Sequence, residues 1–350
     1  MPEFVTPPPL ERGDRVAIVA PSSGIAAAYP HVYELGLERL RTVFDLEPVE
    51  YPTATKDDEY LAAHPAERAG DVVDAFRDPE IGGVVTTIGG SDQLRILEHL
   101  DPAVLREHPT RFYGISDNAN LTSYLWNEGV VSYYGGSVMT TLAMQGSMSE
   151  YSVEYLERAF FEESIGEIEP ADRFTDQDLD WADPDTLDQR REFEDNPGWR
   201  WAGGDEPADG RVWGGCLDVL VPFLAADRYA PEASDLEGCV LLLEPSEELP
   251  SAEEVRMALL AMGERGILDA IDGVLVGRAK ARSPWERPGP EERAAYRERQ
   301  RETIETIVGE YNPEAPIVFD VEVGHTAPTV PVPIGGRAVV DPVDERITFP

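Results

Sequence analysis

Ser116 lies between a predicted strand and a predicted helix. The short apolar run Phe112–Ile115 precedes it, and a helix is predicted over 119–126. Backbone N–H groups and the helix dipole favour negative charge at such a junction, which suits a nucleophile whose attack creates an oxyanion. The surrounding Gly-Ile-Ser-Asp-Asn lacks the last glycine of the Gly-x-Ser-x-Gly nucleophile elbow, and Ser116 could instead serve only as a helix N-cap.

Glu244 and His325 have the chemistry to activate such a serine. Glu244 ends the apolar run 238–244, where a carboxylate is costly without a partner, and His325 follows Gly324 just beyond a predicted strand. A serine needs a base to accept its proton, and the imidazole needs a carboxylate to fix its tautomer. Glu244 could instead pair with an arginine and His325 could be a loop histidine. The order Ser, Glu, His along the chain is therefore compatible with a catalytic triad. The sequence alone does not show that the three side chains meet in the folded protein.

The first half of the chain alternates predicted strands with amphipathic helices. We expect strands at 16–20, 47–51, 81–88, 111–115 and 130–134, and helices at 33–43, 65–76, 94–100, 119–126 and 153–161. This alternation favours a parallel sheet with helices on both faces, whose active sites lie beyond the carboxyl ends of the strands. Ser116 and the Gly89-Gly90 turn both fall at such ends. Ser22-Ser23-Gly24 could lie there too, but it matches no phosphate-binding pattern.

The composition changes at about residue 167 and again at about residue 211. The stretch 167–210 is rich in Asp, Glu, Pro and Gly and is long for a simple connection, so it is either a disordered linker or a functional lid. Its tryptophans argue for order. Beyond it we expect strands at 238–244, 273–277 and 317–321, helices at 251–265 and 290–310, and a closing hairpin of 335–340 with 346–349. The predicted fold is α/β, with domains 1–165 and 211–350 joined by a Trp-bearing insert, 166–210.

The charge is extreme, with 68 acidic against 29 basic residues and a net charge of −39. Because the acids are spread along the whole chain, a solvated acidic shell of the halophile type explains them better than an acidic tail. Self-repulsion should then destabilise the fold at low salt, and high salt should screen it. No basic stripe is available to meet phosphates, so we expect no nucleic-acid polymer as partner.

Several classes of protein are disfavoured by what the sequence lacks. The apolar runs are too short to cross a bilayer and the N-terminus has no leader pattern, so we expect a cytoplasmic protein without a membrane partner. The two cysteines, Cys216 and Cys239, form no C-x-x-C pair, and no two histidines have metal-ligand spacing. We therefore expect no metal site.

Five short motifs in order resemble the LD-carboxypeptidase family of serine peptidases. They are the opening strand and turn 13–23, the glycine turn 87–92, Gly-Ile-Ser-Asp-Asn at 114–118, Leu-Leu-Glu-Pro-Ser-Glu-Glu at 242–248 and Val-Gly-His-Thr at 323–326. The family includes muramoyl-tetrapeptide carboxypeptidases and microcin C immunity-type carboxypeptidases. The resemblance implies a flavodoxin-like N-terminal parallel sheet carrying Ser116, and a smaller C-terminal α/β domain carrying Glu244 and His325.

The same resemblance implies cofactor-free amide hydrolysis by a homodimer. Ser116 would be the nucleophile, His325 the base and Glu244 the residue that holds the imidazole. The oxyanion would be bound by the backbone N–H of Asp117 and one from Gly89 or Gly90.

The microcin-immunity branch is the more similar one, through Val-Trp-Gly-Gly-Cys at 212–216 and the Trp-bearing insert. Enzymes of that branch cleave an amide between an acidic aminoacyl group and a nucleotide-like moiety. Trp181, and next Trp199, could stack on a base, or the tryptophans could only pin the loop. Cys216 replaces an expected polar amide, and Lys280 is the first lysine after Glu244, so a murein-type tetrapeptide remains a possible substrate. The sequence is also compatible with a non-catalytic small-molecule binding protein on the same fold and, less well, with a general esterase.

Overall fold

The computed structural model describes residues 3–283 and 285–350. The chain folds into two compact units. The first unit comprises Met1–Ser164, Leu179–Arg191 and Val330–Gly335. The second comprises Ile165–Asp178, Glu192–Thr329 and Gly336–Pro350. The predicted insert 166–210 therefore contributes segments to both units.

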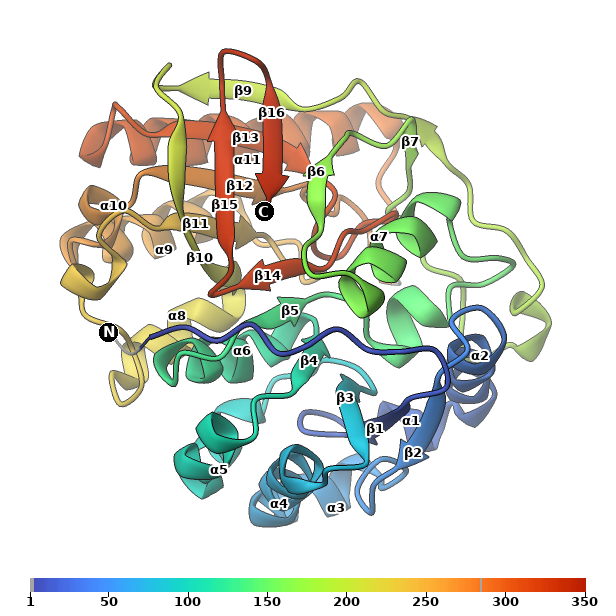
Figure 1. The fold of residues 1–350 in the computed structure, drawn as a ribbon. Helices are drawn as coiled ribbons and strands as arrows, with labels where there is room; N and C mark the ends of the chain where they lie inside the picture. The colour runs from blue at the N-terminus through green and yellow to red at the C-terminus, as the bar shows by residue number, and fades with distance from the viewer. Residues whose placement is uncertain (1–2, 284) are drawn as a thin grey trace. The chain divides into compact units, whose positions relative to one another are not determined.

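The sheet of the first unit confirms the expected flavodoxin-like topology. Its strands are β1 Arg15–Val19, β2 Glu47–Glu50, β3 Ile81–Thr86, β4 Arg111–Gly114, β5 Ser132–Tyr134 and β14 Val332–Ile334. The first five are parallel and lie in the order 2-1-3-4-5, which is that of flavodoxin-like folds. β14 comes from near the end of the chain and pairs antiparallel with β5, as the red and green strands of Figure 1 show. This last pairing was not predicted.

The helices of the first unit follow the strands closely in sequence. They are α1 Ile25–Ala28, α2 Pro30–Thr42, α3 Asp58–Ala63, α4 Pro65–Arg77, α5 Pro102–Glu107, α6 Ala119–Asn127 and α7 Glu150–Phe161. The unit also has the 3₁₀ helices η1 Gln93–His99, η2 Ser116–Asn118 and η4 Pro184–Thr186, and the π-helix η3 Val138–Leu142. Proline opens α2, α4 and α5, where its fixed φ favours the first helical turn.

The helix predicted over 94–100 is wrong in type, because the segment is a 3₁₀ helix. Gln93 explains the tighter winding. Its backbone N–H donates to Asp117 and its side chain bonds both Asn118 and the N–H of Leu121, so this end is fixed to the loop after β4. Asp101 then caps the next helix directly afterwards.

The second unit is built on a sheet whose centre is parallel. The strands of this unit are β6 Gly166–Ile168, β7 Arg173–Phe174, β8 Glu194–Asp195, β9 Arg200–Gly203, β10 Ala208–Cys216, β11 Val240–Glu244, β12 Gly273–Gly277, β13 Pro316–Val321, β15 Arg337–Asp341 and β16 Arg346–Phe349. The sheet order is β6-β16-β15-β10-β11-β12-β13-β9, with β10 to β13 parallel, and β7 pairs with β8 separately. The helical segments are α8 Leu217–Ala226, η5 Ala233–Leu236, α9 Ala252–Glu264, α10 Ile267–Ala270 and α11 Pro290–Tyr311.

Two features of the second unit bear on the predictions. β15 and β16 form the expected closing hairpin. Residues 166–210 are not a disordered linker, because β6 extends the sheet beside β16 and β9 extends it beside β13. In the described residues, no helix has both the length and the apolar character needed to cross a membrane.

Candidate active site

Ser116 lies in the first unit at a sharp bend between β4 and α6. Its φ is +63°, in the left-handed region, which costs a residue with a side chain roughly 1–3 kcal/mol. Its backbone N–H donates to the hydroxyl of Tyr134, at the end of β5, over 3.0 Å. The N-cap of the 3₁₀ turn is Ile115 and that of α6 is Asn118, so the N-cap interpretation of Ser116 is wrong. A strained serine on a strand-to-helix turn is instead the geometry of a nucleophile elbow.

The carboxylate of Asp117 ties the loop after β3 to the loop after β4. One oxygen accepts the backbone N–H groups of Asp92 (2.9 Å) and Gln93 (2.8 Å), and the other accepts the side-chain amide of Asn120 (2.9 Å). Burial raises the pKa of Asp117, while the hydrogen bonds from the backbone N–H groups of Gln93 and Asp92 oppose the rise by stabilising the charged form. The side chain of Asp117 is thus an anchor that fixes the backbone beside Ser116.

Gly89 lies so close to Ser116 that only glycine fits. A Cβ on Gly89 would come 2.6 Å from the Ser116 Cβ and 3.0 Å from its Oγ. The hydroxyl of Ser23 donates to the Gly89 carbonyl over 2.7 Å, and a Cβ on Gly90 would come 3.1 Å from the Ser23 Cβ. The loops after β1, β3 and β4 therefore meet at the carboxyl edge of the sheet. In a sheet of order 2-1-3-4-5 this edge, between β1 and β3, is where the connections change direction and ligands bind.

Glu244 and His325 meet within the second unit. Glu244 is the last residue of β11 and is fully buried, and its Oε2 is 2.9 Å from Nδ1 of His325. An ionised carboxylate only accepts, so Nδ1 carries the proton and Nε2 is left as the basic nitrogen. Gly324, with φ +95°, allows the Glu244 carboxylate to lie against the backbone next to His325, because a Cβ on residue 324 would overlap that carboxylate.

The pKa of His325 is raised above its ordinary value. Burial is the largest single influence and lowers it, but the charge and hydrogen bond of Glu244 outweigh burial. Glu247 adds to the rise and Lys280 opposes it. His325 is therefore a buried imidazole whose protonated form is stabilised by a carboxylate, which is the environment a catalytic base requires.

The two predicted substrate-binding tryptophans belong to different units. Trp181 lies in the first, where its carbonyl is 2.8 Å from Nε2 of His31 and its ring centroid is 5.8 Å from that of Tyr29. Trp199 lies in the second, where its indole N–H donates to Glu322 over 2.8 Å. Among the described residues, no group of His, Cys, Asp and Glu is arranged to hold a metal ion.

Sequence reasoning missed two residues near these sites. Nothing local distinguishes Tyr134 from any buried aromatic residue at a strand end. Glu322 did have a signal: with Asp320 it is one of two carboxylates in the run from Ile317 to Val323, whose other residues are apolar. Its side chain is 1% exposed, so it needed partners.

Two family models match the chain, one on each half. The LD-carboxypeptidase N-terminal domain matches residues 16–135, and the LD-carboxypeptidase C-terminal domain matches residues 209–340. The chain belongs to the LD-carboxypeptidase family. It is thus a serine-type carboxypeptidase, and the family predicted from the five motifs is confirmed.

Relatives within the LD-carboxypeptidase family extend over nearly the whole chain. A probable murein peptide carboxypeptidase of Bacillus subtilis is 26% identical, over 97% of this chain and 92% of the relative. The microcin C7 self-immunity protein MccF of Escherichia coli is 21% identical, over 97% and 94%. Both branches named from the motifs are therefore represented among these relatives.

Solved structures agree with this membership. An MccF-like protein from Streptococcus pneumoniae, crystallised in complex with AMP, superimposes with a TM-score of 0.86 at 29% identity, over 96% of this chain and 98% of that one. MccF in complex with aspartyl sulfamoyl adenosine has a TM-score of 0.83 at 19% identity, over 99% and 98%, and at that identity shows the shared fold alone.

Proposed function

We propose that this carboxypeptidase hydrolyses an amide bond with a Ser116–His325–Glu244 triad. The bond between Glu244 and Nδ1 of His325 is the observation that carries the proposal, because it prepares Nε2 as a base. The strained bend at Ser116 supports the role of nucleophile. The backbone N–H of Asp117, with one from Gly89 or Gly90, would bind the oxyanion, and the close approach of Gly89 to Ser116 supports this placement.

The chemistry then follows from the roles of the three side chains. Ser116 Oγ attacks the scissile carbonyl carbon while His325 Nε2 takes its proton. The Glu244 carboxylate stabilises the imidazolium that results. His325 next returns the proton to the leaving amine, and a water molecule, activated in the same way, releases the acyl group from Ser116.

The substrate we favour is an aminoacyl-nucleotide conjugate of the microcin C type. Support comes from the AMP complex of the Streptococcus pneumoniae protein, the more similar of the two solved structures described. In this proposal Trp181 stacks on the base, and its half-buried position beside Tyr29 supports that role. Murein-type tetrapeptides are the second candidate, because of the Bacillus subtilis relative. We further propose a cytoplasmic, salt-adapted homodimer; its salt adaptation is supported by the net charge of −39.

A two-substrate assay in molar KCl separates these candidates. We expect the enzyme to cleave an aspartyl-sulfamoyl-adenosine conjugate, releasing aspartate, and to leave a murein tetrapeptide largely intact. Chromatography of both reactions measures this directly. Cleavage of the tetrapeptide alone would move the enzyme to cell-wall peptides, and binding of the conjugate without cleavage of either would identify a small-molecule binding protein.

The contact between Gly89 and Ser116 makes its own prediction. Gly89→Ala should lower kcat on the order of a hundred-fold, because the added methyl forces the nucleophile out of position. Gly70→Ala is the matched control: it lies within α4, has nothing within 4 Å of its new Cβ, and should leave kcat unchanged. Full activity in Gly89→Ala would contradict the placement of Ser116.

A further inference from the structure

The loop that carries His325 is held at both of its ends by residues of the Trp-bearing insert. This His325 loop comprises residues 322–327, directly after β13. Two pieces of the second unit, 171–178 and 196–199, contact it. We refer to these two pieces together as the brace.

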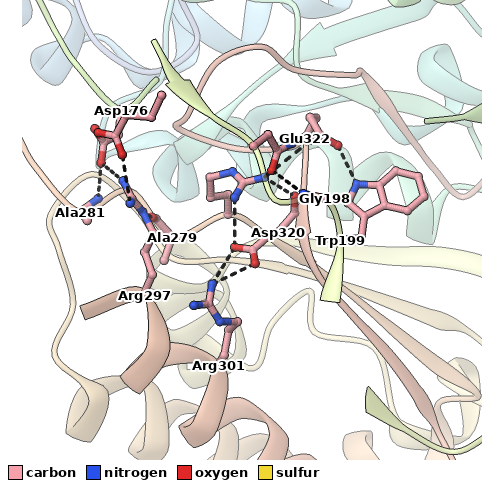
Figure 2. A network of polar contacts seen from close by, with 12 residues as sticks. Asp176, Gly198, Trp199, Ala279, Ala281, Arg297, Arg301, Asp320 and Glu322 are labelled. Carbon is pink, nitrogen blue, oxygen red and sulfur yellow. Dashed lines mark hydrogen bonds and ion pairs between the residues drawn. The ribbon is translucent and has the colours of Figure 1, made fainter. Parts of the chain in front are cut away.

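At the start of the loop, the brace surrounds the carboxylate of Glu322. One of its oxygens accepts the indole N–H of Trp199 (2.8 Å), and the other accepts the side-chain amide of Asn196 (2.9 Å) and the backbone N–H of Ala171 (3.2 Å). Figure 2 shows the Trp199 ring with its nitrogen directed toward Glu322. A carboxylate that is 1% exposed is stable only with such partners, so Glu322 and the brace depend on each other.

The positive charge of Arg278 balances the negative charge of Glu322. Its guanidinium is 3.7 Å from Glu322 and donates to the Asn196 side-chain oxygen (2.8 Å) and the Asp320 carbonyl (3.0 Å). The amide of Asn196 thus bridges Arg278 and Glu322. The ring of Phe174, also in the brace, lies 4.2 Å from the Arg278 guanidinium carbon.

At the end of the His325 loop, the backbone of the brace pairs with the backbone of the loop. Thr175 and Ala327 exchange two hydrogen bonds, of 2.7 and 2.8 Å. The next residue, Asp176, is bonded to the side chains of Arg282 and Arg297 and to the N–H of Ala281, as Figure 2 shows for the labelled residues. The segment that holds Ala327 is therefore itself anchored to the residues after β12 and to α11.

We propose that Glu322, held by Trp199, is a positioning residue that keeps His325 in hydrogen-bond contact with Glu244. The inference rests on the proposed function, in which His325 is the base. Only Val323 and Gly324 separate Glu322 from His325, and a glycine at φ +95° gives the loop freedom to move unless its ends are fixed. Losing the anchor at Glu322 would let the imidazole move away from its carboxylate.

This role competes directly with base stacking by Trp199. A stacking tryptophan acts through its ring face, which phenylalanine partly replaces. A positioning tryptophan acts through its N–H, which phenylalanine lacks. Trp199→Phe therefore separates the two roles, and Trp201→Phe is the matched control because Trp201 lies on β9 with its ring centroid 6.4 Å from that of Trp199.

Trp199→Phe should lower kcat on the order of ten- to a hundred-fold, with KM for the aspartyl-sulfamoyl-adenosine conjugate nearly unchanged. The second readout is the pKa of His325 in the substrate-free enzyme, followed by NMR with His325→Gln to assign its signal. The groups that face this imidazole are Glu244 and Glu247, which raise its pKa, and Lys280, which lowers it. Weaker contact with Glu244 should move the pKa downward, while Trp201→Phe should leave both kcat and pKa unchanged.

Glu322→Gln tests the same contact from the opposite side and replaces Trp199→Phe should that variant not fold. It should shift kcat and the His325 pKa in the same directions, and the double variant should lose little more than either single one. An unchanged His325 pKa in both folded variants would overturn the proposal, and a raised KM with normal kcat in Trp199→Phe would assign Trp199 to stacking. Because the titration needs no substrate, it reports on the brace even where the proposed hydrolysis fails.

Discussion

Replacing Ser116 with alanine is expected to abolish hydrolysis, with kcat lowered on the order of a million-fold. Without Oγ no acyl-enzyme can form, and the remaining rate would come from substrate binding and the oxyanion donors alone. Alanine keeps the Cβ and therefore the strained backbone at φ +63°, so the free energy of unfolding should barely change. Hydrolysis of the aspartyl-sulfamoyl-adenosine conjugate by wild type and variant, at equal folded concentration, measures the effect.

Ser116→Gly is the informative control for this experiment. It is equally inactive by the same reasoning, but glycine adopts a positive φ without strain, so we expect the free energy of unfolding to rise by about 1 kcal/mol. Denaturant titration of the three proteins measures the difference. Turnover by Ser116→Ala close to that of wild type would refute the nucleophile assignment, whereas a Ser116→Gly variant less stable than wild type would refute only the strain argument.

Replacing Glu244 with glutamine is expected to lower kcat on the order of ten-thousand-fold. The amide is neutral and can present a donor to Nδ1, which would turn the imidazole to the wrong tautomer. Loss of the carboxylate also removes the main influence that raises the pKa of His325, so that pKa should fall. Glu248→Gln removes the same charge from an exposed position four residues along and should leave both quantities unchanged.

The pH dependence of stability checks the Glu244 contact independently of activity. A histidine whose pKa is raised by folding stabilises the folded state below its ordinary pKa, about 6.5, and that stabilisation is lost as the pH rises through the raised value. Wild type should show this loss in its free energy of unfolding, and Glu244→Gln should show less of it. Equal pH dependence in the two proteins would mean that the Glu244–His325 bond does not exist in solution.

Local sequence pattern was sufficient to predict part of this protein. Strand and helix periods in the first half predicted a parallel α/β sheet, and the observed order 2-1-3-4-5 is consistent with that pattern. Five short motifs were enough for the family. They also singled out Glu244 and His325, which the fold of the second unit brings to 2.9 Å.

Features that depend on contacts between distant residues emerged only from the folded chain. The pairing of β14 with β5 joins segments about two hundred positions apart, and no periodicity encodes such a partner. The positive φ of Ser116 was not evident from the local residues, which were also consistent with an N-cap. The engagement of Trp199 by Glu322 was hidden for the same reason: a buried carboxylate must find partners, but sequence specifies only the need, and folding selects the partner.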